Sequence, residues 1–395
     1  MTRIPRGVWV LGFVSLLMDT SSELVHSLLP LFLTTTLGAS VEMVGVIEGI
    51  AESTAMFAKV VSGYLSDRQQ RRKGWVLAGY GLAALSKWIF PLATSVGLVA
   101  TARFVDRVGK GIRGAPRDAL IADITPAAVR GASFGLRQAL DSVGAVLGPA
   151  LAIAAVAAFA GNVRMALWIA VIPAVLCVAL ILFGVDDRAA RAPPVRKVIV
   201  AADLRQLDRR FAAVCAIAVL MTLARFSEAF LILRAQSIGA TALQAPLVMI
   251  AMSAVYAVLA FPAGRWVDHG GAKASLYVGC AALFAAHLVL AGAASLPLVL
   301  VGAALWGAHL AFTQGLFAAW VANIVPAGLR GSAFGVFSLA SGIALLAASA
   351  LAGVLWERIS PAATFYAGAM LIALAAVAVA MMDMRGQGLA EAPKE

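Results

Sequence analysis

The chain has 395 residues, of which 62% are hydrophobic and only 13% are charged, and its mean hydropathy is +0.92. Soluble proteins are closer to half apolar and about a quarter charged, so this composition excludes a soluble enzyme, a disulfide-rich secreted domain and a disordered chain. The 31 basic and 20 acidic side chains leave a formal net charge of +11. So many apolar residues are typical of a protein that crosses a membrane many times, and in such a protein the positions of the charges carry most of the functional information.

Apolar runs bounded by charged residues, Gly and Pro predict an all-α membrane protein with twelve transmembrane helices. We expect these helices at about 8–34, 42–64, 74–95, 97–122, 131–157, 163–184, 210–235, 243–264, 273–293, 297–322, 331–355 and 361–383. One long polar break divides them into two groups of six. The sequence therefore predicts an N-terminal six-helix bundle (1–184), a cytoplasmic linker (185–209) and a C-terminal six-helix bundle (210–395).

The basic residues predict the orientation of the spans. With both termini in the cytoplasm, nineteen Lys and Arg residues fall on the inner side and three, Arg164, Arg234 and Arg358, fall on the outer side. Basic residues gather in the cytoplasmic loops of membrane proteins. We therefore expect a multi-pass protein of a bacterial inner membrane with both termini in the cytoplasm.

The two halves of the sequence repeat each other at an offset of about 200 residues. The repeated residues and their counterparts are Pro126 and Pro326, Arg130 and Arg330, Gly131 and Gly331, Phe134 and Phe334, and Gly135 and Gly335. Because six predicted spans separate the copies, both halves have the same orientation in the membrane. Two parallel, pseudo-symmetric bundles are typical of transporters that rock about a site near the membrane midplane.

A polar motif follows the second predicted span. It reads Gly63-Tyr64-Leu65-Ser66-Asp67-Arg68-Gln69-Gln70-Arg71-Arg72-Lys73, and a degraded copy contains Gly264 and Asp268. The motif resembles the loop signature G-x-L-x-D-R-x-x-R-R of the major facilitator superfamily, although Gln70 stands where many members have Gly. The resemblance covers essentially the whole chain, and it implies the fold of that superfamily and transport by alternating access.

The resemblance also implies a role for this loop, which in the family latches the inner side of the transporter. The acid at the end of span four, Asp123, is a natural partner for Arg71. The expected gating latch consists of Gly63, Asp67, Arg68, Arg71, Asp123 and Asp268.

Span five carries a second motif. Its residues Gly135, Gly144, Gly148 and Pro149 have the spacing G-x8-G-x3-G-P, which is similar to the antiporter motif of drug:proton exporters in the same superfamily. Small residues at these intervals let helices approach closely, and Pro bends a helix. The sequence departs from the family pattern just after the motif, where alanine and isoleucine replace a usual Gly pair. Ordinary helix packing by small residues is the alternative interpretation.

Nine basic residues fall inside the predicted spans, and five of them lie in span four. At 100° per residue, these five and two acids of the same span fall within about 140° of the helical wheel. Such a face cannot contact lipid, so it must line a water-filled cavity or a protein interface. The candidate substrate-binding residues are Arg103, Asp106, Arg107, Lys110 and Arg113 and, in span seven, Arg225. The alternative is that these charges mostly neutralise one another, because eight acids lie inside the spans as well.

Span one offers a matching polar face with Asp19, Glu23 and His26. Together with Glu228 of span seven, these are the candidates for proton coupling, because a buried carboxylate or imidazole next to a movable base can switch its protonation state. The alternative for His26 is a polar residue that has no part in coupling.

The sequence contains no HExxH, G-x-S-x-G or Walker motif, so we predict a secondary transporter and not an enzyme. The leading hypothesis is a proton-coupled exporter, an antiporter, of a small organic solute that is anionic or amphiphilic. The alternative is an importer of an anionic nutrient or metal chelate by proton symport. We expect a functional monomer whose partners are a small-molecule substrate, protons and the lipid bilayer, with no nucleic acid, cofactor or bound metal.

Overall fold

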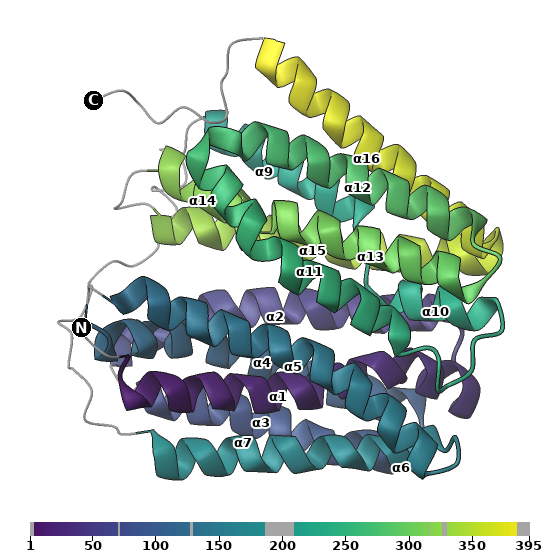
Figure 1. The fold of residues 1–395 in the computed structure, drawn as a ribbon, viewed down its shortest axis with the longest axis horizontal. Helices are drawn as coiled ribbons and strands as arrows, with labels where there is room; N and C mark the ends of the chain where they lie inside the picture. The colour runs from purple at the N-terminus through teal and green to yellow at the C-terminus, as the bar shows by residue number, and fades with distance from the viewer. Residues whose placement is uncertain are drawn as a thin grey trace. The chain divides into compact units, whose positions relative to one another are not determined.

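The computed structural model describes residues 4–69, 72–126, 129–185, 209–314, 316–325 and 330–384. Over these ranges the chain forms helices joined by loops and no strand (Figure 1). The prediction of an all-α protein is confirmed.

The first half of the chain contains the six predicted spans, the last of them built from three consecutive helical pieces. The elements are α1 (Arg6–Leu31), the π-helical turn η1 (Phe32–Thr36), α2 (Val41–Gln69), α3 (Arg72–Leu92), α4 (Val96–Ile124), α5 (Arg130–Ala158), α6 (Val163–Leu167), the 3-10 turn η3 (Trp168–Ala170) and α7 (Val171–Gly184).

The second half follows the same order, and its first span is interrupted. The elements are α9 (Arg209–Ala224), α10 (Ala229–Ser237), α11 (Leu247–Trp266), the π-helical turn η4 (Val267–Gly271), α12 (Ala272–Gly292), α13 (Leu296–Thr313), α14 (Leu316–Ile324), α15 (Arg330–Arg358) and α16 (Pro361–Met384). The prediction of a continuous helix over 210–235 is wrong, because this span breaks between α9 and α10. The helix predicted over 297–322 is described as α13 and α14 on either side of Gly315, which lies outside the described residues.

The internal repeat of the sequence is also present in the bounds of the helices. Both ends of α12 lie 200 residues after those of α3, and both ends of α15 lie 200 residues after those of α5. The starts of α4 and α13 show the same offset. The repeat seen in the loop motifs therefore extends through the helices between them.

Ten helical segments of the described chain are long and apolar enough to cross a membrane. The helices α2 and α4, of 29 residues each, are long enough but fall outside this set. Both carry several charged side chains in the middle of the predicted span, and this charge is what lowers their hydropathy.

The helices group into two compact units. Unit 1 consists of Met1–Ser40, Ile50–Lys197 and Ala240–Ile250, and unit 2 consists of Val41–Gly49, Val198–Gly239 and Ala251–Glu395. Most of the predicted linker, 185–209, lies outside the described residues. The domain boundaries drawn from the sequence stay a prediction.

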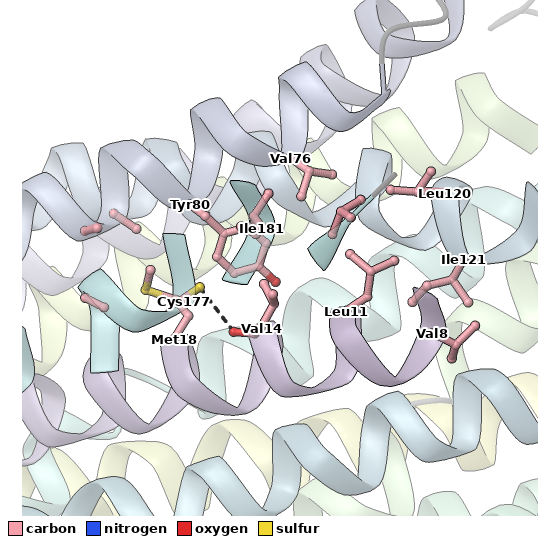
Figure 2. Close-up of a cluster of buried hydrophobic side chains, with 14 residues drawn as sticks. Val8, Leu11, Val14, Met18, Val76, Tyr80, Leu120, Ile121, Cys177 and Ile181 are labelled. Carbon is pink, nitrogen blue, oxygen red and sulfur yellow. Dashed lines mark hydrogen bonds between the residues drawn. The ribbon is translucent and has the colours of Figure 1, made fainter. Parts of the chain in front are cut away.

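An apolar core in unit 1 holds α1 against α3, α4 and α7 (Figure 2). The contribution of α1 is Val8, Leu11, Val14 and Met18, whose spacing of three or four residues places them on one face of the helix. The other helices contribute Val76, Tyr80, Leu120, Ile121, Cys177 and Ile181. The Cys177 thiol donates a hydrogen bond of 3.3 Å to the Val14 carbonyl. This packing keeps the polar side chains of α1 within reach of α3 and α4.

Candidate functional site

Helix α4 is wedged between α2 and α3 by two glycines. A Cβ atom at Gly109 would lie 2.6 Å from the Gly79 carbonyl oxygen of α3, and one at Gly111 would lie 2.6 Å from the Ala55 carbonyl oxygen of α2. No side chain fits at either position, so the three backbones approach closely. The close approach brings the charges of α4 next to those of its neighbours.

The N-terminal half of the α4 charged face forms a largely buried ion network between three helices, α2, α3 and α4. Lys87 of α3 lies 2.7 Å from the Asp106 carboxylate and donates a hydrogen bond of 3.2 Å to Ser22 of α1. Asp106 also lies 3.8 Å from Arg103 and 3.9 Å from Arg107. These bases in turn reach Glu52 of α2, at 3.8 and 3.1 Å. We call Glu52, Lys87, Arg103, Asp106 and Arg107 the α4 ion network.

The next turn of α4 joins α1. Arg113 lies 3.6 Å from the Asp19 carboxylate, and its guanidinium stacks 4.7 Å from the centre of the Tyr80 ring. Arg117 donates a hydrogen bond of 2.9 Å to Ser15 of α1. A basic residue of α4 thus stands beside the first of the acids predicted to couple protons.

The C-terminal turns of α4 pair with α5. Asp118 lies 3.1 Å from Arg117 and 3.8 Å from Arg137, and Arg137 bonds Asp141 within its own helix. Two bases and two acids balance here, so this group fits the structural interpretation of the intramembrane charges better than a role in substrate binding.

Burial separates four of the bases from three of the acids, whereas Asp106 is as buried as the bases. The side chains of Lys87, Arg103, Arg107 and Arg113 are at most 4% exposed. The side chains of Asp19, Glu23 and Glu52 are 22–26% exposed. Lys110 is the exception among the bases, because it is exposed and forms no ion pair within the described part of the chain. We call Asp19, Glu23, Glu52 and Lys110 the accessible layer of the site.

Glu23 and Glu52 approach Lys110 from two different helices. Both carboxylates interact electrostatically with His26, Arg107 and Lys110, and Asp19 interacts with Lys110 as well. The buried His26 ring lies 3.5 Å from Glu23. The structure therefore brings three of the four candidate coupling residues to the α4 face.

Two glycines of the span-five motif pack against this part of α1. A Cβ at Gly144 would lie 2.8 Å from the Leu16 carbonyl oxygen and 3.1 Å from the Asp19 Cβ. A Cβ at Gly148 would lie 2.7 Å from the Glu23 Cβ. At Gly135, a Cβ would meet no described atom within 4 Å, so this first glycine of the motif does not serve close packing.

The gating latch is only partly described. Asp123 pairs with Arg72 at 2.8 Å, one residue after the predicted partner Arg71, which lies outside the described residues. A Cβ at Gly63 would lie 3.3 Å from the Ala115 Cβ of α4, which supports close packing there. The side chains of Asp67, Arg68 and Asp268 lie outside the described part of the structure.

Comparison with known proteins identifies the family. The family model described as Major Facilitator Superfamily matches residues 11–234 and 212–395. The chain belongs to the major facilitator superfamily. It is an integral membrane transporter with many spans, and not an enzyme.

Relatives of this transporter occur in archaea and bacteria. An uncharacterised MFS-type transporter of Methanocaldococcus jannaschii is 31% identical over 375 residues, which cover 93% of this chain and 92% of the relative. An uncharacterised protein of Mycobacterium tuberculosis is 30% identical over 360 residues, covering 89% and 87%. The solved nucleoside transporter NupG shares the fold, with a TM-score of 0.79 at 14% identity and coverage of 95% and 99%.

Unit 2 of this transporter holds Arg225 and Glu228 at the break between α9 and α10, where the sequence predicted mid-helix positions. Two other helices bond to the broken backbone. His287 of α12 lies 2.9 Å from the Ala224 carbonyl oxygen through Nε2, and the Ser227 N–H donates to the Ser349 hydroxyl of α15 at 3.1 Å. Backbone groups freed by a break inside a membrane need such partners.

Corresponding positions of the two halves carry different chemistry. Lys87 and His287 are 200 residues apart, as are Asp106 and Trp306. In unit 1, Lys87 and Asp106 form a buried ion pair. In unit 2, the corresponding residues His287 and Trp306 form an edge-on aromatic pair with ring centres 5.3 Å apart. Phe226 joins the aromatic pair at 5.5 and 5.6 Å. The halves of this transporter therefore share a packing scheme, with ions in one and aromatic rings in the other.

Sequence reasoning left Lys87, Glu52 and His287 out of the candidate site, although Lys87 was counted among the nine basic residues inside the spans. Glu52 joins the α4 ion network, and the signal for it was an acid four residues after Glu48 inside an apolar span. His287 supports the break in span seven, and its signal was its place 200 residues after the intramembrane Lys87.

Proposed function

We propose that this transporter is a proton-coupled exporter, an antiporter, of a small organic solute. The observation that carries the proposal is the pairing of Asp19 with Arg113 at 3.6 Å, with the acid partly accessible and the base buried. A carboxylate in this position can take a proton from water and can be released from its base when it does so.

The proposed cycle begins with the proton. When a proton binds a carboxylate oxygen of Asp19, the negative charge that attracts Arg113 is lost, and the α1–α4 contact loosens. Glu23 can do the same with His26, which lies 3.5 Å away. The solute binds the accessible layer when the acids are charged, and the rocking of the two bundles exposes the layer to either side in turn.

The packing of α5 favours antiport over symport. The glycines that match the exporter motif, Gly144 and Gly148, touch α1 beside Asp19 and Glu23. A change in the charge of either acid can therefore alter the contact between α5 and α1.

We also propose that the Arg72–Asp123 pair belongs to the inner latch. The protein acts as a monomer in a bacterial inner membrane with both termini in the cytoplasm.

The test is transport in proteoliposomes with an imposed pH gradient. A thermal-shift screen of organic ions on the detergent-solubilised protein first selects a solute that binds. We expect that an inward proton gradient drives this solute outward, and that Asp19→Asn and Glu23→Gln abolish the dependence on the gradient while the protein is expressed normally. Glu357→Gln, an exposed acid of α15, serves as the matched control and should transport like the wild type.

Three other outcomes of this experiment would contradict the proposal. Uptake in the direction of the proton gradient would identify the alternative, a proton symporter that imports an anionic nutrient or metal chelate. Transport that ignores pH in the wild type would indicate an uncoupled facilitator, and unchanged coupling in both variants would exclude Asp19 and Glu23.

A further inference from the structure

The α4 face looks strongly basic in the sequence, but its accessible part has the opposite balance. Of the five bases on this helix face, Arg103, Arg107 and Arg113 are buried against acids. What a solute can reach in the accessible layer is three carboxylates and one ammonium group. The arginines set the positions of the acids more than they offer charge to a ligand.

The carboxylates of Glu23 and Glu52 are each held in place by a buried side chain. The Glu52 carboxylate lies 3.1 Å from Arg107, which is itself part of the buried ion network. The Glu23 carboxylate lies 3.5 Å from the buried His26. Preorganised carboxylates of this kind can hold an ammonium group without losing side-chain freedom at the moment of binding.

Lys110 is the one charge of the layer that has no fixed partner within the described residues. It lies within electrostatic range of all three acids of the layer, so it faces them and not lipid, where an unpaired ammonium would be costly. The Lys110 ammonium group can therefore pair with an anionic group of a ligand.

We propose that the accessible layer recognises a zwitterionic solute, with its ammonium group between Glu23 and Glu52 and its acidic group at Lys110. A simple anion meets three carboxylates and is repelled, and a simple cation leaves Lys110 unpaired. A solute with both charges satisfies both sets of groups. This inference rests on the site of the proposed function, and it narrows the chemical class of the solute.

The test measures binding alone, so it is independent of proton coupling and of the direction of transport. Two matched sets of probes share one apolar body each and differ in charge: leucine, isocaproate and isoamylammonium, and phenylalanine, hydrocinnamate and phenethylammonium. Calorimetric titration of the full-length protein in detergent gives the Kd of each. We expect at least one amino acid to bind about tenfold more tightly than both of its singly charged analogues, as one additional charge contact of about 1.4 kcal/mol would give.

Two variants assign the charges. Lys110→Gln should remove the advantage of the zwitterion over the matched cation, and Glu52→Gln should remove its advantage over the matched anion. Lys110 is exposed, so its variant reports on binding even if the Glu52 variant fails to fold. Lys59→Gln removes an exposed lysine of the neighbouring helix α2 and is the control that should leave the ranking unchanged.

The proposal is overturned if neither amino acid binds, if a matched anion binds more tightly than its amino acid, or if Lys110→Gln leaves the ranking unchanged. Each of these results can occur while pH-driven transport of another solute is intact, and a zwitterion preference can be found in a protein that ignores pH. The failure of this inference is thus distinguishable from the failure of the proposed function.

Discussion

Single arginines close the C-terminal ends of two corresponding helices. Arg164 donates to the Pro91 and Ala93 carbonyls at the end of α3, at 3.1 and 2.6 Å. Arg234 donates to three carbonyls at the end of α12, at 2.8 to 3.1 Å: Leu290, Ala291 and Ala293. The last carbonyls of a helix have no partner in the helix and carry the negative end of its dipole. Two of the three bases expected on the outer side therefore have a structural role.

At this scale we predict that Arg234→Gln lowers the melting temperature of the purified protein. Hydrogen bonds that involve a charged group contribute about 1.5–3 kcal/mol each to stability, and the neutral amide cannot replace all three. Arg358→Gln removes the third of these bases, which is exposed at the end of α15, and should leave the melting temperature unchanged. Equal melting temperatures for the two variants would show that the caps do not stabilise the fold.

Helix pairs are held at the distance that their small residues allow. The glycines of the α5 motif have one spacing in the sequence, but they have two roles in the structure. Gly148 touches α1 at Glu23, and Gly135 meets no described neighbour within 4 Å. The motif therefore marks one helix contact and not a uniform seam along α5.

We predict opposite results for alanine at these two glycines. Gly148→Ala places a methyl group 2.7 Å from the Thr20 carbonyl oxygen, which forces α5 away from α1, with a loss of about 1–3 kcal/mol in stability and slower transport. Gly135→Ala has room and gains up to about 1 kcal/mol of helix propensity. Melting temperatures and transport rates of the two variants check this, and a destabilised Gly135→Ala with an unaffected Gly148→Ala would contradict it.

At the scale of the whole molecule, the charges outside the spans predict the topology and those inside predict the site. The excess of basic residues in alternate loops predicts on which side of the membrane each loop lies. The bounds of α3 and α12 lie 200 residues apart and six predicted spans separate them, so the sequence predicts the same orientation for both halves. The topology predicted from the basic residues therefore agrees with the orientation predicted from the internal repeat.

This consistency gives a labelling prediction. In a variant with Cys215→Ser, which removes the least buried of the three cysteines, a cysteine at Arg358 should react in intact cells with a membrane-impermeant maleimide. A cysteine at Arg265, an exposed residue at the end of α11, should react only after the cells are opened. The reverse pattern would place both termini outside.

The sequence by itself determined the family, the number and order of the spans, the repeat and the helix that carries the charges. These features depend on local hydropathy, on a period of 3.6 residues and on motifs within single helices and loops. They can be read without knowing which helix lies beside which.

Only the tertiary structure decided which charges are paired and which can be reached. Asp123 pairs with Arg72, one residue after the expected partner Arg71, which lies outside the described residues, and one residue turns a side chain by about 100° around the helix axis. The break after Ala224 is supported by His287, which is 63 residues away in the chain. The arginines of the basic α4 face are buried against acids from α1, α2 and α4 itself. The part of the site that stays accessible is therefore mostly acidic and surrounds Lys110. This charge compensation depends on packing between helices, which the sequence does not show.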